Sequence, residues 1–144
     1  MTYAELEEFA LQLPETTVGP SFGGAPALRV NKKMFARLRG EMAEQVDELT
    51  GAAYGDVLMV KVSDLGEKEA LLAAAGGAYF TVPHYDGYPA VLVRLDRADR
   101  AELCELLVDA WERTAPRRAV RARADAGQDP QSGLGVGEPG IPRS

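Results

Sequence analysis

Apolar residues recur at helical spacing in three stretches of the chain. The first stretch opens with Thr2 as a predicted N-cap and Glu5 as its capping-box partner. The second begins near Asp64 and stops at a pair of glycines. The third follows Asp96 and has the most regular period, with an apolar stripe of Leu103, Leu106, Leu107, Ala110 and Trp111. These patterns predict three amphipathic helices, each with one buried face.

Outside these helices, the apolar positions alternate with polar ones or run together with β-branched residues, which is typical of strands. The predicted strands cover residues 27–30, 33–39, 57–62, 79–82 and 90–95, with one more around residues 16–22. Asn31 and Lys32 are expected to form a tight hairpin turn, and residues 85–88 a type I′ turn. The spacing of apolar residues at Met42, Val46 and Leu49 predicts one short helix within residues 40–55.

The order of these elements predicts an α+β fold. One helix is followed by three or four strands, a second helix, two strands and a third helix. The short links between strands predict a two-layer α/β sandwich, in which an antiparallel sheet carries its helices on one face. From residue 119 onward the sequence holds five glycines, three prolines and no aromatic residue. We therefore predict one domain over residues 1–118 and a flexible Gly/Pro-rich tail over residues 119–144.

Composition and charge exclude several classes of protein. The 144 residues include one Cys and one His, so neither an internal disulfide nor a multi-Cys/His zinc site can form within one chain. The net charge of −6 argues against strong non-specific binding to nucleic acid or to an anionic membrane. The N-terminus does not resemble a secretory signal, and no apolar run approaches the ~20 residues of a membrane helix. We expect a cytoplasmic protein without a membrane partner.

No residue pattern in the chain predicts a reaction. His84 has no partners at the spacing of a catalytic triad, and Cys104 lies between two glutamates on the third helix. We therefore predict a binding protein rather than an enzyme, with no catalytic residue, metal site or cofactor. Two interpretations of His84 remain: a loop side chain bonded to the backbone, or a functional side chain that acts as a general base or contacts a ligand together with Tyr85 and Tyr88.

The charged residues of the predicted strands are all basic: Arg29, Lys33, Arg37, Arg39, Lys61 and Arg94. Strict alternation places Met34, Ala36 and Leu38 on one face of their strand. The opposite face then carries Lys33, Phe35, Arg37 and Arg39. If the helices cover the apolar face, the other face gathers cations around Phe35 and Met59. Such a face either binds an anionic partner or is neutralised by loop acids such as Asp47, Glu48, Asp56 and Asp86.

Short runs of characteristic residues are spread over residues 1–118. They are Ser21-Phe22-Gly23, Pro26, residues 29–30, 33–38, 61–62, 82–89 and 91–95, and the third helix through Trp111 to Pro116. Their order and spacing resemble the MmcQ/YjbR-like family. The resemblance implies a two-layer α/β fold like that of type III secretion chaperones, with an antiparallel sheet, and a DNA-binding function. The segment from Gly40 to Gly55 is longer than the turn usual in that family.

The leading hypothesis is therefore a small cytoplasmic DNA-binding protein. The strand cations would contact phosphates, while Phe35 or the loop with Tyr85 and Tyr88 would stack on bases. The alternative is a protein-interaction or chaperone-like module, which would bind a peptide or a second copy of itself through the same sheet face.

Overall fold

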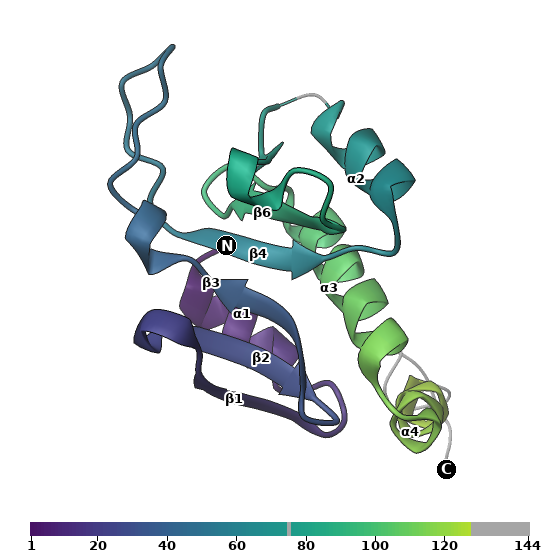
Figure 1. The fold of residues 1–144 in the computed structure, drawn as a ribbon. Helices are drawn as coiled ribbons and strands as arrows, with labels where there is room; N and C mark the ends of the chain where they lie inside the picture. Colours follow the sequence, from purple (N-terminus) through teal and green to yellow (C-terminus); the bar gives the residue numbers. More distant parts are fainter. Residues whose placement is uncertain (75, 128–144) are drawn as a thin grey trace, which may run out of the picture.

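The computed structural model describes residues 1–74 and 76–127 (Figure 1). The main elements are α1 (Tyr3–Ala10), β1 (Thr16–Pro20), β2 (Pro26–Val30), β3 (Lys33–Leu38), β4 (Val57–Lys61), α2 (Leu65–Leu72), β5 (Tyr79–Phe80), β6 (Ala90–Arg94), α3 (Arg100–Thr114) and α4 (Arg117–Gly127). Short 3₁₀ helices lie in three of the loops: η1 (Phe22–Gly24), η2 (Gly40–Met42) and η3 (Pro83–Tyr85). The predicted strands and the three amphipathic helices are thus present, with small differences at their ends.

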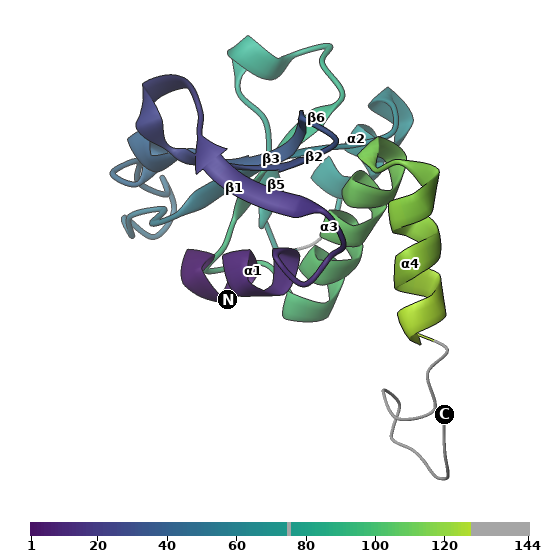
Figure 2. The ribbon, with the colours of Figure 1, turned by 90° about the horizontal axis from the view of Figure 1, so that it is seen from below.

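The strands form one antiparallel sheet. In the described part of the chain it has six strands in the order β1-β2-β3-β4-β6-β5. Helices α1 and α3 cover one face of this sheet, and α2 packs against β5 and β6 (Figure 2). The predicted α+β architecture with an antiparallel sheet is confirmed. No helix within residues 1–74 and 76–127 is long and apolar enough to cross a membrane.

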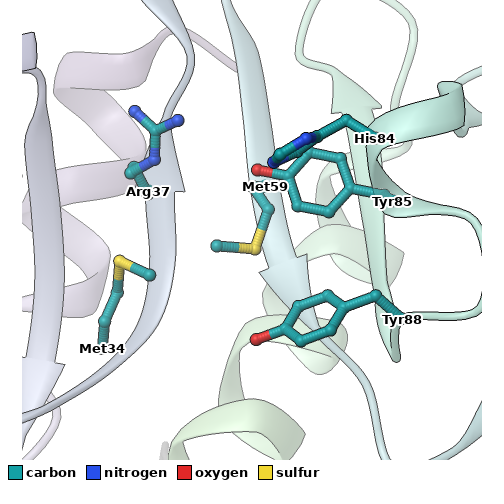
Figure 3. Close-up of a pocket in the computed structure, with 6 residues that line it drawn as sticks. All are labelled: Met34, Arg37, Met59, His84, Tyr85 and Tyr88. Atoms are coloured by element: carbon teal, nitrogen blue, oxygen red, sulfur yellow. The ribbon is translucent and has the colours of Figure 1, made fainter. Parts of the chain in front are cut away.

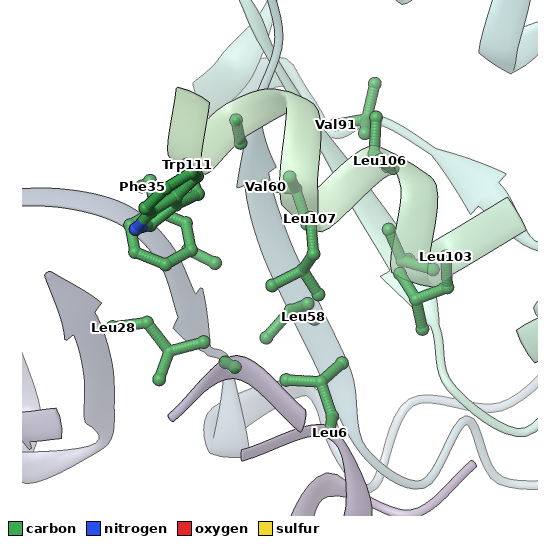
Figure 4. Close-up of a cluster of buried hydrophobic side chains, with 14 of the residues drawn as sticks. Leu6, Leu28, Phe35, Leu58, Val60, Val91, Leu103, Leu106, Leu107 and Trp111 are labelled. Carbon is green, nitrogen blue, oxygen red and sulfur yellow. The ribbon is translucent and has the colours of Figure 1, made fainter. Parts of the chain in front are cut away.

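The main core lies between the sheet and the two helices α1 and α3 (Figure 4). The apolar stripe predicted for the third helix is buried along its whole length, from Leu103 to Trp111. The indole N–H of Trp111 donates to the carbonyl oxygen of Pro14 at 3.1 Å, which ties α3 to the end of the first helical segment. The predicted capping box is also present, because Thr2 and Glu5 exchange hydrogen bonds of 2.9 and 3.1 Å.

A β-bulge between β2 and β3 overturns the predicted alternation of side chains. Leu28 lies opposite Ala36, while its neighbour Arg29 lies opposite Met34, so Phe35 is the extra residue. An extra residue shifts the phase of a strand, and the side chains before it change face. Phe35 therefore joins Ala36 in the main core, fully buried. The prediction that Phe35 lies on the cationic face is wrong.

The backbone angles confirm one of the predicted turns and correct the other. Asn31 and Lys32 both have positive φ, of 55° and 66°, as a two-residue type I′ hairpin requires. In the second predicted turn, Asp86 has φ −59° and ψ 131°, and only Gly87 is positive, with φ 75°. These angles define a type II turn rather than type I′.

The segment that joins β3 to β4 does not form the predicted amphipathic helix. It makes one turn of 3₁₀ helix, η2, and then an extended arm that is closed by an isolated bridge between Val46 and Ala53. Gly51 and Gly55, with φ of 74° and 65°, supply turns that a continuous helix does not permit.

Residues 117–127 form α4, where the sequence analysis placed the start of a flexible tail. Ala119 is buried against the main core, and the guanidinium of Arg118 holds the Glu15 carboxylate through bonds of 2.7 and 2.8 Å. Alanine and arginine are strong helix formers, which favours this helix locally. The rest of the predicted tail, residues 128–144, lies outside the described residues.

Candidate binding site on the outer sheet face

The sheet face opposite α1 and α3, called the outer face below, carries a second and smaller core. Its buried members are Met42, Val57, Met59, Tyr85, Ala90 and Leu92. Tyr54 from the arm and Val82 from the loop before η3 pack against them. The arm and the loop after β5 therefore contact the outer face over β4, β5 and β6. At the border of this covered region, next to β3, the structure has a pocket.

The pocket has a volume of about 280 Å³ (Figure 3). Strand β3 contributes Met34 and Arg37, β4 contributes Met59, and the loop after β5 contributes a wall of aromatic rings: His84, Tyr85 and Tyr88. This volume is just below the usual range for small-molecule sites and suits a single planar group. The pocket thus offers one cation, two thioethers and several ring faces to a ligand.

The aromatic wall has one buried ring and two accessible ones. Tyr85 is 9% exposed, and its ring has the guanidinium of Arg39 above it at 5.3 Å and the His84 ring at its edge. The ring centroids of Tyr85 and Tyr88 lie 6.1 Å apart, and Tyr88 is 43% exposed. Tyr88 and the exposed His84 are therefore the rings of this wall that a ligand can reach.

The structure separates the predicted cationic residues into several environments. Arg37 lies in the pocket, and Lys61 lies half-buried on the same face of the sheet, opposite Ala90. Arg29 is opposite Met34 and donates to the Pro20 carbonyl oxygen at 3.2 Å. The strand register places Lys33 opposite the core residue Val30, on the helix-covered side of the sheet, so the prediction that Lys33 lies on the cationic face is wrong.

Arg94 is neutralised inside the protein. Its side chain is 3% exposed and pairs with the Asp47 carboxylate at 2.9 Å, while the Tyr54 ring lies 4.3 Å from the guanidinium carbon. A second carboxylate, that of Asp96, lies 3.4 Å away. A buried and paired guanidinium cannot contact a phosphate on the surface. For Arg94, the alternative that strand cations pair with loop acids is therefore correct, with Asp47 as the predicted partner.

Comparison with known proteins places this chain in a family. The YjbR family model matches residues 11–113. The chain belongs to the YjbR family. Uncharacterized proteins from Mycobacterium bovis and from two strains of Mycobacterium tuberculosis are 45% identical over 98 residues, which are 65% of this chain and 76% of theirs. All the residues that line the pocket lie within the matched range.

A solved structure shares the fold of this YjbR-family chain. The crystal structure of a protein from Pseudomonas syringae superposes with a TM-score of 0.64 and 19% sequence identity, and the match covers 79% of this chain and 99% of that one. The likeness to type III secretion chaperones stays a prediction.

Lys68 is a residue of this site that the sequence analysis missed. It lies on α2 and is 5% exposed, and its ammonium donates to the carbonyl oxygens of Tyr85 at 2.5 Å and of Tyr88 at 2.9 Å. These two carbonyls belong to the first and last residues of the type II turn. Lys68 therefore fixes the backbone that carries the aromatic wall. One feature of the sequence could have identified Lys68. It lies three residues before Leu71 and four before Leu72, and so falls on the apolar stripe of its helix.

Replacing Lys68 with methionine is expected to lower the free energy of unfolding by about 1.5–3 kcal/mol, the usual contribution of a hydrogen bond to a charged group. Amide exchange of Tyr88, whose N–H bonds to the Tyr85 carbonyl oxygen at 3.0 Å, should accelerate at the same time. Urea unfolding and hydrogen exchange measure the two effects. Lys33→Met, at an exposed position, is the control. Equal behaviour of the two variants would contradict the anchoring role.

Proposed function

We propose that this YjbR-family protein is a cytoplasmic binding protein that takes single-stranded DNA on its outer face. One base would occupy the pocket beside Tyr88, and a neighbouring phosphate would contact Arg37. The observation that supports this proposal is the pocket formed jointly by β3, β4 and the loop after β5, in which a guanidinium lies among aromatic and thioether side chains. No catalytic role or cofactor is part of the proposal.

The chemistry of the pocket suits an unstacked base. Any base can stack on an aromatic ring, and such stacking contributes roughly 1–3 kcal/mol per base. The thioethers of Met34 and Met59 are polarizable and adapt to flat ligands, which favours contact with different bases. A guanidinium offers a planar fork of donors that matches phosphate oxygens. The pocket therefore supports binding without a strong base preference.

The charges on the outer face support weak binding through few phosphates. Arg94 is buried and paired with Asp47. The phosphate contacts we propose are three half-buried cations of this face: Arg29, Arg37 and Lys61. The net charge of −6 opposes long-range attraction of DNA. We expect dissociation constants in the range of ordinary non-specific binding, ~10⁻⁴–10⁻⁶ M. Duplex DNA should bind more weakly than single strands, because its bases are stacked and cannot enter the pocket.

The test is a fluorescence anisotropy titration of labelled oligo-dT over a series of salt concentrations. Tyr88→Ala should weaken binding by roughly 5- to 150-fold, the equivalent of one lost stacking contact. Arg37→Ala should also lower the salt dependence, reducing the slope of log K against log salt by about 0.7, the value for one phosphate contact on a single strand.

Arg100→Ala provides the matched control. Arg100 lies on α3, is 60% exposed and is remote from the outer face, so its loss should leave the slope unchanged. The proposal fails if oligo-dT does not bind at low salt. It also fails if Arg100→Ala and Arg37→Ala reduce the slope equally.

A further inference from the structure

The arm between β3 and β4 carries an apolar tip into solvent. It comprises residues 43–55 and extends away from the sheet (Figure 1). Leu49, at its tip, is 95% exposed, and Val46 on the same arm is 56% exposed. A single exposed leucine is common on protein surfaces. Here, however, the leucine lies at the end of a projecting arm whose turn is fixed by hydrogen bonds.

The carboxylate of Asp47 holds the turn at this tip in place. One of its oxygens accepts the backbone N–H groups of Leu49 at 2.8 Å and of Thr50 at 3.1 Å, and the other pairs with the buried Arg94. The two backbone N–H groups, and then Arg94, hold the pKa of Asp47 below its usual value. The Asp47 backbone also bonds to Ala52 and Gly51, at 2.9 and 2.7 Å. The tip is therefore a fixed turn that presents Leu49 outward.

We propose that Leu49 of one copy of this chain inserts into the outer-face pocket of a second copy. The apolar part of that pocket, Met34 and Met59, suits a leucine side chain, and its volume of about 280 Å³ accommodates one. Glu48, the exposed residue next to Leu49, complements the charge of Arg37 in the receiving pocket. If each copy inserts its arm into the other, the contacts repeat across a two-fold axis and form a closed dimer.

This inference uses the same pocket as the proposed function but does not depend on DNA binding. The arm of a second copy and a DNA base would compete for one volume. Oligo-dT that binds should therefore dissociate the dimer, and the dimer should in turn weaken the binding of oligo-dT. If oligo-dT does not bind, self-association of the chain alone decides the inference.

Sedimentation velocity of the full chain over a range of concentrations tests the dimer. The native protein should dimerise reversibly. Leu49→Ser should raise the dimer dissociation constant at least tenfold, because a polar side chain then replaces the leucine that is buried in the pocket of the second copy. Since Leu49 is almost fully exposed, this change leaves the fold intact. Leu65→Ser, at a position on α2 that is 47% exposed, is the matched control and should dimerise like the native protein.

A charge exchange makes the test specific to the arm and the pocket. Glu48→Arg and Arg37→Glu should each be monomeric alone, because like charges then meet at both contacts. Mixed in equal amounts, the two variants should form a heterodimer, since every arm again meets a pocket of opposite charge. Three results would overturn the inference: the native protein stays monomeric, the dimer is insensitive to Leu49→Ser, or the mixture of the two charge variants does not associate. So would a dimer that persists with oligo-dT bound to it.

Discussion

Replacing Trp111 with alanine is expected to lower the free energy of unfolding by about 3–5 kcal/mol, the range for truncating a large buried aromatic. The side chain is fully buried between α3 and the sheet, in the same cluster as Phe35 and Leu28 (Figure 4). Its loss also leaves the Pro14 carbonyl oxygen without the indole N–H that it accepts at 3.1 Å. Urea unfolding measured by circular dichroism determines the change.

The neighbouring position provides the control for this prediction. Glu112 is exposed on the same helix, and Glu112→Ala should change the free energy of unfolding by less than about 0.5 kcal/mol. A loss below about 0.5 kcal/mol for Trp111→Ala would place the indole at the surface. That result would contradict the packing of α3 against the sheet.

The second large effect is expected at Phe35. Phe35→Ala should also cost about 3–5 kcal/mol in the free energy of unfolding, because the bulge in β3 places this ring in the main core. Oligo-dT binding by the folded variant should stay close to that of the native protein. A ring on the outer face would give the opposite pattern, with little loss of stability and weakened binding. Urea unfolding and an anisotropy titration of the same preparation separate these cases.

Met34→Ala is the matched variant for Phe35→Ala. Met34 precedes Phe35 in the chain, is half-buried and lines the outer-face pocket. Its truncation should cost less stability than that of Phe35 and should weaken oligo-dT binding. If Phe35→Ala weakens binding more than Met34→Ala does, the bulge is not where the structure has it.

The comparison of Met34 with Phe35 shows where prediction from sequence stops. Helices α1, α2 and α3 could be predicted because their apolar residues follow the 3.6-residue period, as the buried stripe from Leu103 to Trp111 demonstrates. The strands could be predicted from their composition. We could not predict which side of the sheet each residue occupies. A bulge arises from pairing between strands, and one extra residue reverses the alternation. The sequence of β3 alone carries no signal for it.

The candidate site was predicted as two separate parts. Alternation identified Arg37 as a cation of the outer face, and the loop composition pointed to His84, Tyr85 and Tyr88. That these parts form one pocket depends on the sheet order, in which β4 lies between β3 and β6. Antiparallel links fix the neighbours of a strand only where the connections are short. The sequence therefore identified Arg37 and the aromatic residues of the pocket, but it placed Met34 on the other face of the sheet and did not show that the two parts lie together.

Two other features could be predicted only in part. The composition of residues 119–144 predicts disorder as a whole, yet its first residues are rich in alanine and arginine and form α4. The pairing of Arg94 with Asp47 joins residues 47 positions apart, and the sequence offered several acids as partners. The folded structure decides which acid is the partner of Arg94, because a guanidinium that is 3% exposed requires a close carboxylate.

The methionines offer the most direct test of the outer-face pocket as the binding surface. Of the four in the chain, Met34 and Met59 line the pocket, while Met1 packs against the main core and Met42 lies in the second core. Methyl NMR of methionine-labelled protein, titrated with oligo-dT at low salt and fixed protein concentration, therefore reports on the pocket with internal controls. We predict shifts of the Met34 and Met59 methyl signals and little change at Met1 and Met42. Binding of oligo-dT that leaves the signals of Met34 and Met59 unmoved would contradict the account.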